Sequence, residues 1–304
     1  MGRGSYTASD WAKLRTKRNL NDQQCVEKIF SVQTAITSYS SKSIHLRCSC
    51  DPEADAKATP VIIGFDVTAS MGYLAKELAT NGMHTTIMRL LADKQITDPQ
   101  ILCAAIGDCK SDVTPLQVTQ FEADIRILEQ LLNLHLEGGG GGNNGESYNL
   151  LWYFAAYHTR HDHFEKRGKK GYLFTIGDDY CHSKLTTAEI GRNFTSSSMY
   201  ELANEELLQR VQKKYHVFHI HIDKGLPMDN DIFRQWVQLL PGHCAPISKK
   251  DIVCLPELVT AMIAVTEGKT INEALRGMDQ KRAERIARSV AEIKRTKKTN
   301  AISF

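Results

Sequence analysis

The stretch Val61-Ile62-Ile63-Gly64-Phe65-Asp66-Val67-Thr68-Ala69-Ser70-Met71-Gly72 decides how this chain is interpreted. Its apolar first half, residues 61–65, is typical of a strand that is buried on both faces of a parallel sheet. Asp66, Thr68 and Ser70 follow at the carboxyl end, which is where α/β folds bind their ligands. Three oxygen-bearing side chains in one turn suit a hard divalent cation such as Mg²⁺. The alternative is a hydroxyl that caps a helix after the strand.

The composition is that of an ordinary globular protein. The chain has 304 residues, of which 42% are apolar and 24% charged, with a formal net charge of +3. That length suffices for one large domain with extensions or for two small ones, and the net charge does not itself indicate nucleic acid. No apolar stretch approaches the roughly 20 residues of a membrane span, and residues 1–5 lack the apolar core of a signal peptide. We therefore expect no membrane partner.

The eight cysteines are scattered along the chain without a CxxC pair. Cys48 and Cys50 are too close for an easy disulfide and too isolated for a zinc ribbon. Cys103 lies inside a predicted buried strand. This pattern favours reduced thiols and predicts a cytoplasmic protein.

Apolar runs alternate with segments of helical periodicity in the middle of the chain. The predicted strands span residues 60–65, 101–106, 172–176 and 216–222. The predicted helices span residues 73–91 (broken near Asn81-Gly82), 121–136, 149–158, 231–240 and 256–265. This alternation predicts an α/β fold with a mostly parallel central sheet flanked by helices.

The two ends of the chain differ from its middle. We expect residues 1–58 to form a partly helical N-terminal extension, with a helix within 25–36, and residues 251–304 to form a helical C-terminal extension after a domain at 59–250. Thr270–Lys298 is predicted to be one long helix that begins with a capping box and is basic in its second half. A solvated face is the favoured interpretation of that basic helix, and a nucleic-acid or acidic partner is the alternative.

Carboxylates also follow the second and third predicted strands. Asp108 follows the strand at 101–106, and Asp178 follows the strand at 172–176. Because the carboxyl ends of parallel strands share one edge of a sheet, Asp66, Asp108 and Asp178 are expected to converge. Unpaired acids gathered in a crevice repel one another, and a cation relieves that repulsion.

A glycine run lies between two of the predicted helices. It reads Glu137-Gly138-Gly139-Gly140-Gly141-Gly142-Asn143-Asn144-Gly145-Glu146-Ser147, and it lets the backbone approach an ion or a phosphate closely. No Gly-Lys-Ser/Thr follows, so it is not a Walker loop. Gly140, Gly142 and Gly145 match GxGxxG, but a helix precedes them instead of a strand, which disfavours dinucleotide binding.

Jointly, these segments resemble an intracellular prokaryotic von Willebrand factor A (vWA) domain with a metal-ion-dependent adhesion site (MIDAS). The run that begins at Asp66 is similar to the family's first metal loop, with Thr68 where serine is usual. Residues 140–147 are similar to the GGGDxPES version of the glycine-rich turn, with Asn143 in place of its Asp. Residues 178–182, Asp-Asp-Tyr-Cys-His, are similar to the same subgroup's DxPxH without its proline.

The resemblance covers about residues 59–225 and implies a three-layer Rossmann-like fold with a three-loop metal site. It implies that Thr68 and Ser70 bind the metal through their hydroxyls. Asp66 and Asp178 would bind it directly or hold its water molecules, and Asn143 takes the third-loop position.

The resemblance places three more residues beside the metal without direct contact: Asp108, Asp179 and His182. Asp179 is also an alternative to Asp178 as the residue that binds the metal. The implied ion is Mg²⁺, with Mn²⁺ or Ca²⁺ as alternatives. Two carboxylates roughly neutralise such an ion and hydroxyls add no charge, so an open position can still capture a carboxylate.

The expected function follows from that chemistry. It is a non-enzymatic, intracellular module that binds an Asp or Glu of a protein partner. The resemblance places such modules in multi-protein systems, either associated with AAA+ ATPases or acting in stress and defence. The alternatives are a metal-dependent phosphoester hydrolase and an RNA- or DNA-associated vWA protein that uses the basic C-terminal helix.

Several other groups of residues are weaker candidates. His158, His161 and His163 have spacings conceivable for zinc, but a polar helix exit is the favoured interpretation. His219 and His221 share one strand face and are expected to be a satisfied buried pair. Cys181 and His182 are adjacent, which rarely orients a nucleophile and its base. The basic loop Glu165–Gly171 is expected to be solvated, with phosphate contact as the alternative. We assign no role to the loop Pro115–Glu122.

Overall fold

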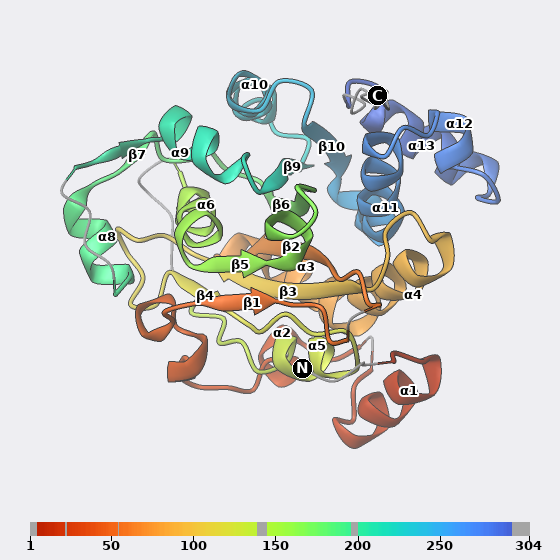
Figure 1. The fold of residues 1–304 in the computed structure, drawn as a ribbon, viewed down its shortest axis with the longest axis horizontal. Coiled ribbons are helices and arrows are strands. Elements are labelled where there is room, and N and C mark those ends of the chain that lie inside the picture. The colour runs from red at the N-terminus through yellow and green to blue at the C-terminus, as the bar shows by residue number, and fades with distance from the viewer. Residues whose placement is uncertain (1–4, 22, 54, 139–144, 196–199, 294–304) are drawn as a thin grey trace.

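A six-stranded sheet forms the centre of the molecule in the computed structural model, which describes residues 5–21, 23–53, 55–138, 145–195 and 200–293. The strand order is β10-β9-β6-β2-β3-β4 (Figure 1), and every neighbouring pair is parallel except β3 and β4. The strands of this sheet are β2 (Thr59–Asp66), β3 (Pro99–Ile106), β4 (Leu116–Val118), β6 (Gly171–Gly177), β9 (Tyr215–Asp223) and β10 (Cys244–Ser248). The α/β class and the four predicted strands are confirmed, and the two edge strands are additional.

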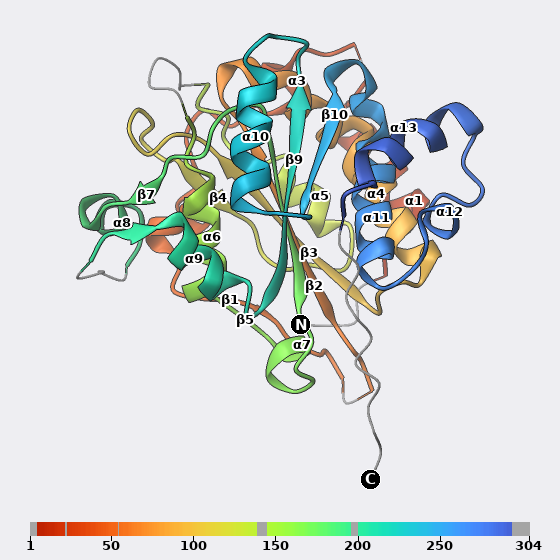
Figure 2. The same ribbon diagram turned by 90° about the horizontal axis from the view of Figure 1, so that it is seen from above.

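Helices cover both faces of the sheet and give three layers (Figure 2). One face packs against α1 (Ala8–Lys17), α3 (Gly72–Glu77), α4 (Met83–Asp93), α5 (Arg126–Leu131), α11 (Leu255–Thr266) and α13 (Gln280–Val290). The other face packs against α6 (Tyr148–Tyr157), α8 (Thr187–Asn193), α9 (Asn204–Val211) and α10 (Asp229–Leu239). Short helices complete the chain: α2 (Val26–Ile29), α7 (Asp162–Glu165) and α12 (Ile271–Ala274).

The central strand β2 shows why a continuous apolar run forms a strand in this fold. Successive side chains point to opposite faces of a sheet. Val61, Ile63 and Phe65 therefore belong to the core on one face, and Ile62 belongs to the core on the other. Both cores exclude water, so each position of the strand must be apolar or small.

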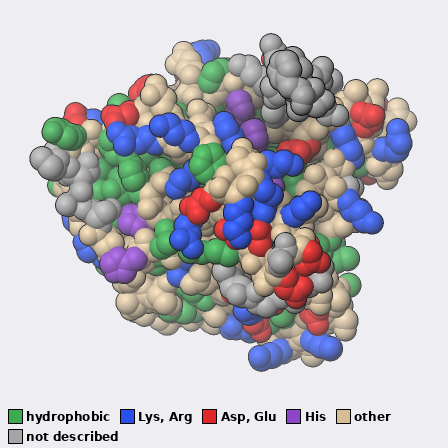
Figure 3. Space-filling view, in the orientation of Figure 1, with side chains coloured by type: hydrophobic (Ala, Val, Ile, Leu, Met, Phe, Trp, Pro, Cys, Tyr) green, Lys and Arg blue, Asp and Glu red, His purple; other side chains and the backbone are tan. Residues whose placement is uncertain are grey.

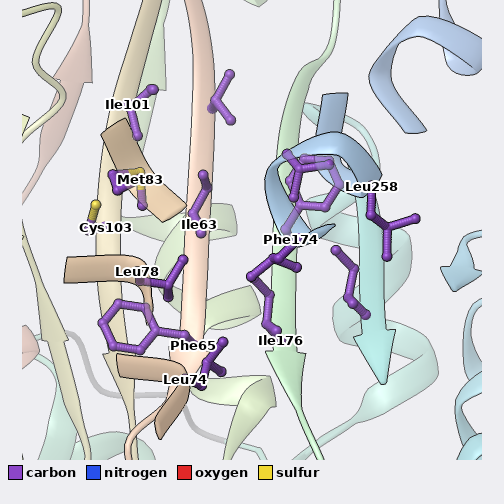
Figure 4. Close-up of a cluster of buried hydrophobic side chains, with 14 of the residues drawn as sticks. Ile63, Phe65, Leu74, Leu78, Met83, Ile101, Cys103, Phe174, Ile176 and Leu258 are labelled. Atoms are coloured by element: carbon purple, nitrogen blue, oxygen red, sulfur yellow. The ribbon is translucent and has the colours of Figure 1, made fainter. Parts of the chain in front are cut away.

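Close packing fixes the helices against this strand. Ile63 and Phe65 lie beside Leu74, Leu78 and Met83 of the segment that runs from α3 to α4 (Figure 4). On the opposite face, a Cβ added at Gly64 would stand 2.2 Å from Cδ2 of Leu151 in α6. A glycine at this position lets α6 approach the sheet closely.

The N-terminal segment packs against the rest of the chain. Its strand β1 (Arg47–Ser49) pairs in parallel with β5 (Thr159–His161) in a separate two-stranded sheet. Asp51 accepts two hydrogen bonds from the guanidinium of Arg167, at 2.7 and 3.1 Å.

Another small sheet joins β7 (Lys184–Leu185) to β8 (Leu202–Ala203) in antiparallel orientation. The division into an extension at 1–58, a domain at 59–250 and an extension at 251–304 stays a prediction.

Several predicted helices differ from the observed ones. The segment 73–91 is continued through Leu78–Gly82 by a turn of π-helix instead of being broken there. The predicted helix at 121–136 is reduced to α5, because Glu122 forms a β-bridge with Ile101 before the helix begins. Within 25–36, only the four residues of α2 are α-helical.

The long C-terminal helix is also corrected. Gly277 adopts a positive φ of 83°, a conformation that ends helices, and it separates α12 from α13. Each helix begins at its own capping side chain, Thr270 for α12 and Asp279 for α13. Residues 294–298 of the predicted helix lie outside the described residues. Among the described residues, none of the helices combines the length and the apolar character needed to cross a membrane.

Candidate metal centre

The predicted carboxylates meet at the carboxyl edge of the sheet. Asp66 is the last residue of β2 and is paired in register with Ile106 at the end of β3. Asp108 follows β3 by two residues, and Asp178 directly follows Gly177 at the end of β6. The exposed fractions of these three aspartates are 0%, 0% and 3%. Three buried acids therefore lie at the ends of three adjacent parallel strands, as the sequence predicts.

Hydrogen bonds hold Asp66 on both of its oxygens. Oδ1 accepts from the backbone N–H of Thr68 at 2.8 Å and from its Oγ1 hydroxyl at 2.6 Å. Oδ2 accepts from the phenol of Tyr148 at 2.9 Å. Burial and the charge of Asp178 together raise the pKa of Asp66 to about 7, against the opposing effect of the hydrogen bonds from Thr68 and Tyr148. Two buried carboxylates thus repel each other beside a hydroxyl.

Asp178 faces a hydroxyl and an ammonium group. Its Oδ2 lies 3.5 Å from the Oγ of Ser70, which is exposed, and 2.8 Å from the Nζ of Lys224. Lys224 follows β9, the next strand along the sheet, and its side chain is 24% exposed. A positive charge from the fourth strand end therefore contacts the acid cluster.

Asp108 and His182 form a second polar group beside the first. The Nε2 of His182 donates to Oδ1 of Asp108 at 2.9 Å, and the same oxygen accepts from the Ser147 hydroxyl at 3.1 Å. The Nδ1 of His182 lies 3.1 Å from the Nζ of Lys110. These two predicted neighbours of the metal thus bind each other, and the imidazole is oriented by a carboxylate.

Asp179 and Asn143 complete the set of predicted site residues. Oδ1 of Asp179 accepts from the backbone N–H of Tyr180 at 2.6 Å, and burial raises the pKa of Asp179. Asn143 lies outside the described residues, so the structure gives it no position.

Glu146, Tyr148 and Lys224 belong to the site although the sequence reasoning did not assign them to it. Glu146 is 3% exposed, and its Oε2 has no hydrogen-bond partner among the residues that the structure describes. Burial, together with the charges of Asp66 and Asp108, raises the pKa of Glu146 to about 9. A buried acid directly after the glycine run is the signal that could have indicated it.

The donor atoms at this edge are suited to a hard divalent cation. Within the described ranges, no group of three His, Cys, Asp or Glu residues is placed to hold a metal. A metal here would therefore need hydroxyl ligands as well, and Thr68 and Ser70 supply them beside Asp66 and Asp178. All four side chains offer oxygen, which Mg²⁺, Mn²⁺ and Ca²⁺ prefer. A cation would also relieve the repulsion between the two carboxylates.

A cavity opens next to this loop. It has a volume of about 660 Å³ and lies between the loop that carries Thr68 and Ser70 and the N-terminal segment. Apolar side chains from both sides line it, together with the polar Thr68 and Ser70: Val26, Phe30, Val32, Val67, Tyr73 and Leu136. A second cavity of about 560 Å³ lies on the other side of the acid cluster and is lined by Lys110 and His182, among others. The acid cluster thus stands between two hollows.

The histidine candidates for zinc are structural instead. His161 accepts a hydrogen bond from the backbone N–H of Phe164 and begins α7, and burial lowers its pKa to about 3. His158 stacks on Phe154 and Phe194. Burial likewise lowers the pKa of His163, to about 4. His158 and His161 thus make separate local contacts, and the buried Nδ1 of His163 has no hydrogen-bond partner among the described residues.

The remaining candidates are also resolved by burial. His219 and His221 are both buried, but only Nδ1 of His219 has a partner among the described residues, the Thr175 hydroxyl at 3.0 Å. The expectation of a fully satisfied pair is therefore wrong. Cys181 is 2% exposed, and burial raises the pKa of its thiol, which opposes a role as a nucleophile.

Comparisons with known proteins give likenesses of fold. No family model matches the chain, and no curated protein matches its sequence. Among solved structures, proximal thread matrix protein 1 of the mussel byssus, with a zinc-occupied MIDAS motif, aligns at 13% identity and a TM-score of 0.42 over 70% of this chain and 49% of that one. The vWF domain of the type V pili tip protein Mfa5 from Porphyromonas gingivalis aligns at 9% identity and a TM-score of 0.45, over 71% of this chain and 98% of that one. BatB from Bacteroides thetaiotaomicron aligns at 11% identity and a TM-score of 0.38, over 66% of this chain and 96% of that one. The chain spans about half of the mussel protein.

Proposed function

We propose that this protein is a binding module that captures an acidic side chain of a protein partner through a divalent cation at the edge of its sheet. One observation carries the proposal. Asp66 and Asp178 are buried side by side with the hydroxyls of Thr68 and Ser70, next to an open cavity. The charge of Asp178 raises the pKa of Asp66, and a divalent cation between the two carboxylates would relieve this repulsion.

The residues of the site would divide the work. Thr68 and Ser70 would bind Mg²⁺ through neutral oxygens, and Asp66 and Asp178 would supply the compensating charge. When bound, the ion would offer a partner's carboxylate an electrophilic position at the surface. Tyr148 keeps Asp66 oriented through the hydrogen bond to Oδ2. Ser70 is exposed, so the site is open to a partner.

A reducing compartment is part of the proposal. All eight cysteines are free, and five of them are buried. Free buried thiols suit a cytoplasmic protein. We also propose that the partner belongs to a multi-protein system, associated with an AAA+ ATPase or with stress or defence, on the resemblance of the motifs alone.

Substitutions at Thr68 test the metal site with a matched pair of variants. Thr68→Val keeps the shape of the side chain but removes the hydroxyl, whereas Thr68→Ser keeps the hydroxyl and removes the methyl group. We expect titration calorimetry with Mg²⁺ and Mn²⁺ to show binding by the wild type and by T68S, and a loss of at least tenfold in affinity in T68V. Equal affinities for T68V and T68S would refute the assignment.

Capture of a partner is tested separately. A pull-down from the native extract is compared with and without EDTA, and with the Ser70→Ala variant. Partners that present Asp or Glu to the ion should be lost in both cases. A partner retained equally in EDTA would show that the module binds without a metal.

The orientation of His182 favours one second candidate, metal-dependent phosphoester hydrolysis. Asp108 holds one nitrogen of the imidazole, and the ring lines the cavity that also contains Lys110. An oriented imidazole next to a cation can serve as a general base. A turnover assay on generic phosphoesters with Mn²⁺ checks this candidate, and no turnover by the wild type would exclude it. Turnover that is unchanged in the His182→Gln variant would exclude His182 as the general base.

Nucleic-acid binding by α13 has less support. Arg282 pairs with Glu257 at 3.3 Å, and Arg285 pairs with Asp251, so part of the positive charge is already compensated. On the face that Figure 3 shows, Lys and Arg side chains are interspersed with Asp and Glu. Binding to a random oligonucleotide that falls steeply with salt would favour this function, and no binding at low salt would remove it.

A further inference from the structure

The strand end of β9 brings a lysine into the predicted metal centre. The Nζ of Lys224 lies 2.8 Å from Oδ2 of Asp178, the oxygen that also faces the hydroxyl of Ser70. Asp178 is 3% exposed, so this contact is largely shielded from water. A buried carboxylate needs a counter-charge, and here the chain supplies one from its own sequence.

We propose that Lys224 and a divalent cation compete for Asp178, so that the site alternates between a lysine-paired state and a metal-loaded state. This inference rests on the proposed function, since it concerns the regulation of the same site. In the absence of metal, the ammonium neutralises Asp178 and keeps the acid cluster stable. When the ion binds, the ammonium must leave, because two cations on one carboxylate repel each other.

The backbone around Lys224 is built to hold the lysine in place while its side chain remains free to leave. Oδ2 of Asp229, at the start of α10, accepts from the backbone N–H of Lys224 at 3.0 Å and from that of Leu226 at 2.6 Å. Gly225 has a φ of 78° and donates to Oδ1 of Asp223 at 2.7 Å. Three hydrogen bonds thus fix the backbone of the turn, and only the flexible stem of the lysine has to move.

The surrounding charges favour this alternation over a permanent ion pair. Lys224 lies among several acids, and its electrostatic partners include Asp179 and Asp229 besides Asp178. A displaced ammonium therefore retains favourable acidic neighbours near its first position. Its 24% exposure also leaves a route to solvent. The cost of displacement is consequently a weaker metal affinity and not a loss of the fold.

Removal of the charge should strengthen metal binding. Lys224→Met keeps the length of the side chain and deletes the ammonium. We expect Mn²⁺ to bind K224M at least tenfold more tightly than wild type, and a tenfold change corresponds to about 1.4 kcal/mol. That difference is within the Coulomb energy of charges a few ångströms apart near a protein surface.

The control is Lys249→Met. Lys249 directly follows β10 at the same edge of the sheet, but its Nζ lies over the ring of Tyr73, 4.1 Å from the ring centroid, instead of pairing with Asp178. K249M should therefore change Mn²⁺ affinity less than about threefold. Binding is followed by electron paramagnetic resonance of free Mn²⁺, and circular dichroism checks that each variant is folded.

A second readout follows the lysine itself. If Mn²⁺ displaces Lys224, its amine becomes more reactive toward an acetylating reagent when the ion is added. The folded wild-type protein is labelled and then digested, and mass spectrometry of the peptides measures that change. We expect the acetylation rate of Lys224 to rise at least threefold with Mn²⁺ and that of Lys249 to stay constant.

The outcomes separate the two proposals. If wild type binds Mn²⁺ and K224M binds no more tightly, competition is refuted and the metal site stands. If K224M binds Mn²⁺ at least tenfold more tightly than wild type and the double variant Asp66→Asn/Lys224→Met does not bind it, the ion is located at this site and competition is supported. If neither wild type nor K224M binds Mn²⁺ at millimolar concentration, the proposed metal-dependent function fails, and competition fails with it.

Discussion

The hydrogen bond between Tyr148 and Asp66 should contribute measurably to stability, and Tyr148→Phe removes it. The phenol donates to Oδ2 at 2.9 Å, and both side chains are fully buried. A hydrogen bond to a charged group is worth about 1.5–3 kcal/mol, and a buried acceptor left without a donor costs a similar amount. We expect Y148F to lower the free energy of unfolding by about 2 kcal/mol at pH 8.5.

The cost should depend on pH with a defined sign. The pKa of Asp66 is raised to about 7 in the folded protein, so the carboxyl is largely ionised at pH 8.5 and neutral at pH 5.5. The hydrogen bond to the neutral form is weaker, about 1 kcal/mol. The unfolded chain releases the proton of Asp66 near pH 4, whereas the folded protein keeps it until about pH 7. The metal-free wild type therefore becomes less stable as pH rises from about 4 to 7.

The matched control is Tyr215→Phe. Tyr215 is also fully buried, but its phenol is 2.8 Å from a neutral hydroxyl, that of Thr159. Its removal should cost about 1 kcal/mol at both pH values. Urea denaturation in EDTA, followed by circular dichroism, gives the free energies. The reasoning is wrong if Y148F costs no more than Y215F at pH 8.5, or if the cost of Y148F is larger at pH 5.5.

Two further predictions concern packing and acid stability. Gly177→Ala would bring a Cβ within 1.9 Å of the Tyr148 phenol oxygen and should destabilise the fold by about 1–3 kcal/mol in urea denaturation. The control is Gly191→Ala, in α8, where nothing lies within 4 Å of the added Cβ. It should be neutral or stabilise the fold by up to about 1 kcal/mol. Burial lowers the pKa of His161 to about 3 in the folded state. Below about pH 6.5 the unfolded chain therefore binds a proton at this histidine while the folded chain does not. Stability is lost as pH falls through this range, by up to about 1.4 kcal/mol per pH unit. In a pH titration followed by circular dichroism, His161→Asn should therefore lower the pH at which acid unfolding is half complete. The control His45→Asn, at an exposed side chain, should leave this midpoint unchanged. A midpoint that H161N does not move would contradict this account.

Much of the fold could be predicted because burial on both faces leaves a direct trace in the sequence. The runs at 61–65 and 172–176 are apolar except for Gly64 and Thr175, since each side of the sheet is covered by helices. The convergence of Asp66, Asp108 and Asp178 follows from the parallel order of three strands. These inferences need only local pattern and one rule of topology.

The errors arise where tertiary contacts override local periodicity. The apolar spacing of 121–136 resembles one long helix, yet Glu122 pairs with Ile101 across the sheet and the helix is confined to α5. In the C-terminal segment, a glycine followed by a capping aspartate at 277–279 was the available signal for two helices, and the periodicity concealed it.

The parts of the site that were missed come from distant positions in the chain. Tyr148 reaches Asp66 across 82 positions of sequence. The contact of Lys224 with Asp178 depends on the neighbouring position of β6 and β9 in the sheet. Neither partner carries a motif of its own, so only the three-dimensional arrangement identifies them.

The parallel pairing of β1 with β5 sets an order for folding during synthesis. Arg47 is in register with Thr159, so β1 leaves the ribosome more than a hundred residues before the strand that completes its hydrogen bonds. At ordinary rates of translation, this delay is on the order of ten seconds. Throughout that time the nascent chain presents an unpaired edge, which can pair with the edge of a neighbouring chain. The yield of native protein should therefore depend on how quickly the segment between the two strands is translated.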